Sequence, residues 1–323
     1  MDKRKNISGR DLLQILKKSF SAFGEDKITK LSGSLAYSTV FSLGPLLIVI
    51  ISLCSIFLGK EAVEGEIYKQ LKGFLGSASA EQVQDIIKNA YVSGKSKFAA
   101  VISGIVLLIG ATAVFSEIQD SINGIWGIKA KPRKGWVKFL QNRFLSFSLI
   151  IGLGFLLLVS LAVNTLIDGF NVKLQLWFPQ VSIILFYIVN FILTAAIVSL
   201  IFAAIFKVLP DANIRWRDVS AGAFATTLLF MLGKFAISFY VSKSNIGSTF
   251  GTAGSLVILL VWVYYSSIIL YFGAEFTKAW SLQYGSPIQP NHYAITTKVV
   301  EVEAGKATIQ EKEKKIQNIK EIK

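Results

Sequence analysis

Six long apolar runs, each uncharged except one, dominate this 323-residue chain and constrain its fold most. Each run has about the 20 residues that a helix needs to cross a bilayer core of about 30 Å. A soluble core of six such helices would need polar-faced partner helices, and the sequence has few. We therefore predict an all-α polytopic membrane protein, a six-helix transmembrane bundle with amphipathic interfacial helices. The runs are Leu35–Leu58, Phe98–Ser116, Phe144–Ile167, Val181–Phe206, Val219–Val241 and Thr252–Ala274.

The composition agrees with this interpretation. Apolar residues make up 53% of the chain and charged residues 17%, against about 45–50% and about 25% in soluble domains. Its single cysteine, Cys54, lies within the first run, which excludes an intrachain disulfide and a cysteine-based metal cluster. The net charge of +14 indicates that the polar surface is basic.

The distribution of Lys and Arg predicts the orientation of the bundle. Of 34 basic residues, 25 lie on the side that holds both termini, 8 lie on the other side and Lys234 lies within a span. The positive-inside rule then places both termini in the cytoplasm. Residues 1–34 are polar and lack a signal-peptide pattern, so we expect an uncleaved first span in the cytoplasmic (inner) membrane. Residues 1–34, 35–284 and 285–323 are the predicted amphipathic segment, membrane domain and polar cytoplasmic tail.

Three segments outside the runs carry helical patterns. Ser8 begins a capping box, and the residues after it form an apolar face beside Lys17 and Lys18. This helix either lies on a membrane surface with anionic headgroups or packs on the inner end of the bundle. Residues 118–126 predict an interfacial helix anchored by Trp126. In the external loop 59–97, two apolar stripes predict a helical hairpin or a lid.

The sequence lacks the residues that most enzymes need. Its only histidine, His292, lies in the predicted tail, and no P-loop or G-x-S-x-G motif is present. Metal centres need several ligands converging on one ion, and the spans hold no acidic cluster. We therefore expect no catalytic residue, no cofactor and no metal. The basic residues follow the membrane edge, which argues against nucleic acid as a partner.

Polar residues within the apolar runs are candidates for a transport path. Lys234 is about 10 Å deep, with Asn190 at comparable depth and Asn164 and Asp168 closing the third run on the same side. They line an external vestibule, or the lysine extends to the outer headgroups.

A second polar group gathers at the predicted cytoplasmic ends of the runs. Pro45 removes a backbone hydrogen bond and should kink the first helix. These side chains line a headgroup or solute path, or serve only as hydrogen bonds between helices. The group comprises Tyr37, Pro45, Glu117, Tyr264, Tyr265 and Glu275.

The cytoplasmic segment Leu209–Val219 has its own pattern. Pro210 ends the fourth run and Asp211 caps the turn that follows. Arg215 and Arg217 flank Trp216, which predicts either an interfacial anchor whose cations face phosphates or only a topology determinant under the positive-inside rule. We also expect Glu117 or Glu275 to pair with one of these arginines.

Four ordered pieces of this sequence resemble the YihY/virulence factor BrkB family of bacterial inner-membrane proteins. The resemblance covers about residues 10–282 and implies six membrane helices in the cell envelope. It implies no settled activity, and the residues argue against the ribonuclease BN label that some members carry. The pieces are Leu35–Tyr37 with Phe41–Leu46; Phe115–Gln119 with Asn123–Gly127; Leu209–Val219 with Gly222–Ala223; and Gly251–Leu256 with Trp262–Tyr265 and Gly273–Thr277.

Two functions of different classes follow. The first is transport or lipid handling, in which an amphiphile or small solute moves through or along the bundle and Lys234 meets an anionic group. The second is a scaffold that transports nothing and organises envelope proteins through its external loop and its tail.

Overall fold

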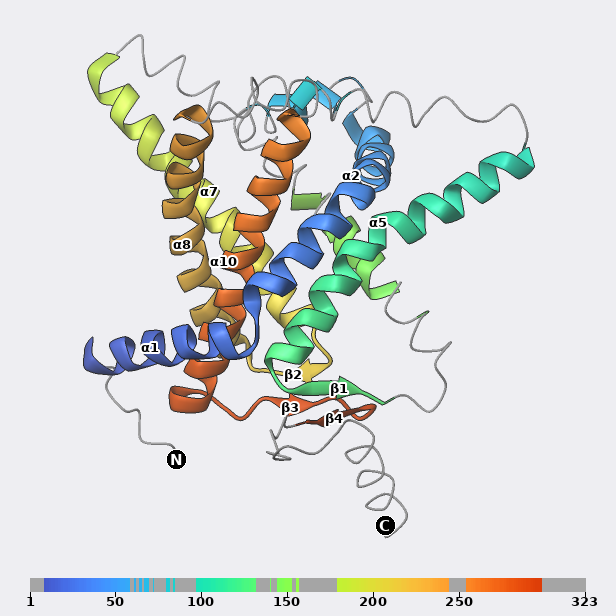
Figure 1. The fold of residues 1–323 in the computed structure, drawn as a ribbon. Coiled ribbons are helices and arrows are strands. Elements are labelled where there is room, and N and C mark those ends of the chain that lie inside the picture. The colour runs from blue at the N-terminus through green and yellow to red at the C-terminus, as the bar shows by residue number, and fades with distance from the viewer. Residues whose placement is uncertain are drawn as a thin grey trace, which may run out of the picture.

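A computed structural model describes residues 9–58, 97–131, 144–152, 179–243 and 254–297, with a few separate positions at 61–84, 140 and 155–156. Within these ranges the chain is mainly helical (Figure 1). The long helices are α1 (Gly9–Glu25), α2 (Ile28–Leu58), α5 (Lys97–Ile125), α7 (Pro179–Val208), α8 (Trp216–Lys243) and α10 (Gly254–Tyr284). The strands are β1 (Ile128–Ala130), β2 (Ala212–Asn213), β3 (Gln289–Pro290) and β4 (Ala294–Thr296).

Three of the described helices are long and apolar enough to cross a membrane: Ile188–Val208, Trp216–Ile237 and Leu256–Tyr284. They correspond to the fourth, fifth and sixth predicted runs. Helix α2 is a fourth candidate if its two halves form one span. The described residues therefore support three or four spans, and most of the predicted third run lies outside them.

Helix α2 bends by 53° between its segments Ile28–Leu43 and Pro45–Ile51. The sequence predicts a kink at this position. The proline ring removes one backbone donor and crowds the preceding turn. Helix α5 crosses α2 at this bend, with Gly110 against the ring. A Cβ at Gly110 would lie 2.9 Å from the Cγ of Pro45, so the crossing requires glycine or a shift of the ring.

Helix α10 is the central element of the described bundle and contacts α1, α2, α5 and α8, while α7 packs on α8 (Figure 1). Two glycine–threonine pairs bring α8 and α10 close together. A Cβ on Gly222 would lie 1.8 Å from the Oγ1 of Thr277, and one on Gly273 would lie 2.0 Å from the Oγ1 of Thr226. Each hydroxyl donates to a carbonyl of its own helix, so close packing leaves neither donor unpaired.

The strands gather at one end of the bundle, which we call the strand end (Figure 1). There, β2 pairs with β3 and β1 with β4, both antiparallel. Residues 285–297, which the sequence places in the polar tail, thus return across the helix ends and pair with β1 and β2. Residues 298–323 lie outside the described residues.

Residues 118–125 continue α5 and are mostly buried, instead of forming the predicted separate interfacial helix. Trp126 is 6% exposed and its Nε1 donates to the backbone carbonyl of Ala274 at 3.1 Å. The prediction of an interfacial tryptophan anchor is therefore wrong here. The helical spacing of apolar residues in 118–126 reflects burial against the other helices.

Helix α1 lies across the strand end against α10 (Figure 1). Ile15 and Ser19 are fully buried, and the ring of Phe20 lies 4.9 Å from that of Phe272. Leu13 and Phe20 are nevertheless 69% and 67% exposed. The helix therefore packs on the bundle and also keeps an apolar face free for a membrane surface.

Candidate functional site

Asp211 is the centre of a buried hydrogen-bond network at the strand end. Its carboxylate, 2% exposed, accepts from Gln119 Nε2 at 3.2 Å, Asn123 Nδ2 at 3.0 Å and Tyr293 Oη at 3.0 Å. Its own backbone N–H donates to Oδ1 of Asn123 at 2.8 Å, and its carbonyl accepts from the N–H of Asn291. One side chain thus joins α5, the α7–α8 connection and the returning segment, which is more than the turn cap the sequence predicts.

Asp218 forms a second link between the start of α8 and the segment after α10. It is 2% exposed, and its Oδ2 accepts from the backbone N–H of Ser286 at 3.0 Å. Its place in the first turn also suits the positive end of the helix dipole. Gly285 lies so close that a Cβ there would be 2.3 Å from the carboxylate Oδ1.

A cluster of charges lies where the α1–α2 corner meets α10. Nζ of Lys278 is 3.6 Å from Oε2 of Glu275 and 3.4 Å from Oδ2 of Asp26, and it also donates to the carbonyl of Ile125. The Glu275 side chain is 1% exposed, while those of Lys278 and Asp26 are about one-third exposed. Glu275 therefore takes its cation from its own helix, and the predicted pairing of Glu275 with Arg215 or Arg217 is wrong.

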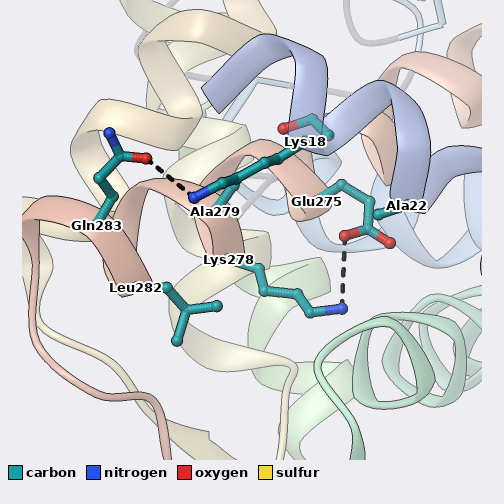
Figure 2. Close-up of a pocket in the computed structure, with 8 residues that line it drawn as sticks. Lys18, Ala22, Glu275, Lys278, Ala279, Leu282 and Gln283 are labelled. Carbon is teal, nitrogen blue, oxygen red and sulfur yellow. Dashed lines mark hydrogen bonds and ion pairs between the residues drawn. The ribbon is translucent and has the colours of Figure 1, made fainter. Parts of the chain in front are cut away.

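A pocket of about 320 Å³ opens beside this cluster, between α1 and the last turns of α10 (Figure 2). Lys18 reaches across it, and its Nζ donates to Oε1 of Gln283 at 3.5 Å. Lys278 and Glu275 meet on the other side, and Leu282 also lines the pocket. Its lining is Lys18, Ser19, Ala22, Glu275, Lys278, Ala279, Leu282 and Gln283. A pocket with two ammonium groups, one carboxylate and apolar walls suits a charged amphiphile.

The arginine–tryptophan motif lies on the surface of the strand end. Arg215, Trp216 and Arg217 are all exposed, the tryptophan by 60%. The Nζ of Lys207 lies 5.8 Å from the centre of the Trp216 ring and donates to the carbonyl of Ile214. Pro210, which follows the end of α7, is buried. This exposed basic and aromatic patch has the composition of a headgroup-level anchor.

Lys234 lies near the other end of α8 and is half-buried. Tyr265 packs beside it on the neighbouring helix: a Cβ at Gly233 would lie 2.2 Å from the phenol oxygen. Asn190 is exposed on α7 and accepts from Oγ1 of Thr194 at 3.4 Å. The described structure therefore brings Tyr265 next to the Lys234 segment, while Asn190 lies on an outer face of α7.

The other predicted site residues are spread over the bundle. Tyr37 is 67% exposed and its ring lies 5.0 Å from that of Phe41, so it faces outward from α2. Glu117 and Tyr264 are partly buried, on α5 and α10. Asn164 lies outside the described residues.

A family model described as Virulence factor BrkB matches residues 19–295 of this chain. The chain belongs to this family. A UPF0761 membrane protein of Pseudoalteromonas atlantica is 29% identical over 255 residues, which cover 78% of this chain and 81% of its own. A UPF0761 membrane protein of Haemophilus influenzae is 28% identical over 259 residues, which cover 78% of this chain and 90% of its own. No solved structure matches.

The BrkB family match extends beyond the resemblance found in the sequence, which stops near residue 282. Its end at residue 295 takes in β3 and most of β4. Residues 285–295 therefore belong to the family domain and not to an appended tail. The same segment supplies Tyr293 to the Asp211 network.

Sequence reasoning on this BrkB family member missed most of the residues that build the two polar clusters. In the sequence Gln119 and Asn123 stand out only as parts of a motif, yet their i, i+4 spacing places both on one helix face. Asp26 and Lys278 carried no signal, because their contact joins positions 252 residues apart. The sequence leaves open whether Lys18 faces a membrane surface or the bundle, and the packing of α1 on α10 brings it to the pocket.

Proposed function

We propose that this BrkB family member handles a lipid or a similar amphiphile in the cytoplasmic membrane, and that it does so without covalent chemistry. In this proposal the pocket between α1 and α10 receives the headgroup. The pocket itself is the observation that carries the proposal, since it combines Lys18 and the Glu275–Lys278 pair with apolar lining at a helix end.

The surroundings of the pocket support a lipid over a small soluble solute. One wall is an amphipathic helix whose Leu13 and Phe20 remain exposed, and the other is the end of a helix long enough to span a bilayer. Leu282, which lines the pocket, is itself 72% exposed. A headgroup in the pocket would leave its acyl chains against these apolar surfaces.

In the proposed orientation the strand end faces the cytoplasm and both termini lie there. The basic residues of the described strand end support this side: Lys17, Lys18, Lys27, Lys30, Lys129, Lys131, Lys207, Arg215, Arg217 and Lys278. A cytoplasmic leaflet rich in anionic lipids attracts Lys and Arg. Lys234, near the other end of α8, would meet the headgroup of a lipid in the opposite leaflet.

Purified protein in liposomes that carry headgroup-labelled lipids tests the proposal. We expect membrane-impermeant reductant to quench more label than the outer leaflet holds, and Lys18→Gln and Lys234→Ala to abolish the excess. Lys17→Gln is the matched control, because Lys17 is an exposed lysine of α1 that does not line the pocket. Quenching that never exceeds the outer-leaflet share, or an excess that both variants retain, would overturn the proposal.

A further inference from the structure

We infer that the pocket between α1 and α10 selects a zwitterionic aminophosphate headgroup, that of phosphatidylethanolamine, with its phosphate at Lys18 and its ammonium at Glu275. This inference rests on the proposed function and names the lipid class that the same pocket takes. It follows from which charges of the pocket are already paired.

The positive charge available to a ligand is that of Lys18. Its Nζ contacts the neutral amide of Gln283 at 3.5 Å, a long hydrogen bond that a phosphate oxygen replaces with a charge-assisted one. Lys278 is occupied, since it lies within 4 Å of both Asp26 and Glu275 and donates to the carbonyl of Ile125. One lysine, and not two, therefore faces an incoming anion.

The acidic group that can accept the cationic end of a ligand is Glu275, although its Oε2 already lies 3.6 Å from Nζ of Lys278. Its side chain is 1% exposed and lines the pocket, and its Oε1 has no hydrogen-bond partner among the described residues. Asp26 and Glu275 share the single ammonium of Lys278, so an ammonium brought by a ligand would favour the charged form of Glu275. A buried carboxylate oxygen without a donor favours a ligand that brings a cation.

The two groups open to a ligand lie on different helices, Lys18 on α1 and Glu275 on α10, and they accept ligand groups of opposite charge. A zwitterion satisfies both at once, while an anionic headgroup such as phosphatidylglycerol satisfies Lys18 and is repelled by the carboxylates. The small side chains of Ala22 and Ala279 leave the space between them open. Exposed Leu282 at the mouth favours the lipid over soluble phosphoethanolamine.

Titration calorimetry on the full-length protein in detergent tests this inference with three probes: dihexanoyl-phosphatidylethanolamine, dihexanoyl-phosphatidylglycerol and soluble phosphoethanolamine. We expect the first to bind about tenfold or more tightly than the second, because it gains one charge-assisted contact. Glu275→Gln removes this preference and Lys18→Gln weakens both lipids. Glu25→Gln and Lys17→Gln, exposed residues of α1 outside the pocket, change neither.

The outcomes separate the inference from the proposed function. Equal binding of both lipids, or a preference that survives Glu275→Gln, overturns the zwitterion assignment and leaves a headgroup pocket. No binding of either lipid overturns both. If soluble phosphoethanolamine binds as tightly as its lipid, the charge pattern is supported and the lipid source is overturned. Ala279→Leu, which fills the pocket without altering its charges, must weaken every probe; unchanged binding overturns the site.

Discussion

Exchanging the acid and the amide in the Asp211 network tests whether this network holds the strand end together. In the wild type, Oδ1 of Asp211 accepts from Gln119 and Tyr293, while Oδ2 accepts from Asn123. Asn123 cannot turn its amide over, because its Oδ1 already accepts from the backbone N–H of Asp211. Each donor and acceptor therefore has a fixed place.

Each single substitution breaks this pattern in a different way. Asp211→Asn sets one NH₂ group against another, so we expect a loss of about 1–3 kcal/mol in unfolding free energy. Asp211→Ala leaves the amide donors of Gln119 and Asn123 unpaired and should lose about 2–6 kcal/mol. Asn123→Asp sets two buried carboxylates side by side and is also destabilising.

The double variant Asp211→Asn with Asn123→Asp restores the hydrogen bonds named above with acid and amide exchanged. We expect it to recover most of the loss, with a coupling energy of about 1–3 kcal/mol. Unfolding free energies in mixed micelles, from detergent titration followed by tryptophan fluorescence, measure the cycle. Asn213→Ala, an exposed neighbour on β2, is the control and should change stability by no more than about 0.5 kcal/mol. Additive losses in the double variant would refute the role of the network.

Further predictions concern the helix contacts and the proposed path. Gly222→Ala should lower the yield of monodisperse protein, and adding Thr277→Gly should restore it, because the clash is with that side chain, its Cβ included; size-exclusion chromatography measures both, and no rescue would mean that the backbones do not approach so closely. Trp126→Phe should cost about 1 kcal/mol in unfolding free energy by losing one hydrogen bond to a backbone carbonyl, and a loss below about 0.3 kcal/mol would contradict it. Lys234→Ala should abolish lipid movement in liposomes at unchanged expression, whereas unchanged movement removes Lys234 from the path. Truncation after Tyr284 should lower the melting temperature, since it removes β3 and β4; an unchanged melting temperature would show that these strands do not stabilise the bundle.

The helices could be predicted from the sequence because the bilayer fixes their length. Runs of about 20 apolar residues are visible without knowledge of any contact, and α7, α8 and α10 coincide with three of them. The bend at Pro45 was predictable for a similar local reason, since it depends on one residue and its own helix. Helix ends were less predictable: α10 continues ten residues beyond the apolar run, through Glu275 and Lys278.

The strand end could not be predicted, because its contacts join distant positions. Asp211 and Asn123 are 88 residues apart, and the two-residue strands carry no alternating pattern to detect. Residues after Tyr284 look like a polar tail, since Gly285, Pro287 and Pro290 break the helical pattern and charged residues follow. Only the tertiary pairing of β3 with β2 and β4 with β1 shows that they belong to the domain.

The helix contacts gather toward one end of the described bundle because of how helices pack in lipid. Within lipid, apolar helices gain little by exchanging lipid contacts for one another, so small-residue contacts and hydrogen bonds must set how they pack. The described structure has both kinds of contact toward the strand end. The small-residue contact is that of Gly222 with Thr277 between α8 and α10, and the hydrogen bonds are those of the Asp211 network, which joins α5 to the chain after α7. These fixed contacts hold α10 in place, and α1 packs on its last turns. A pocket bounded by α1 and this fixed helix end therefore has one wall set by the core and one wall, α1, whose exposed apolar face would lie against the membrane in the proposed orientation.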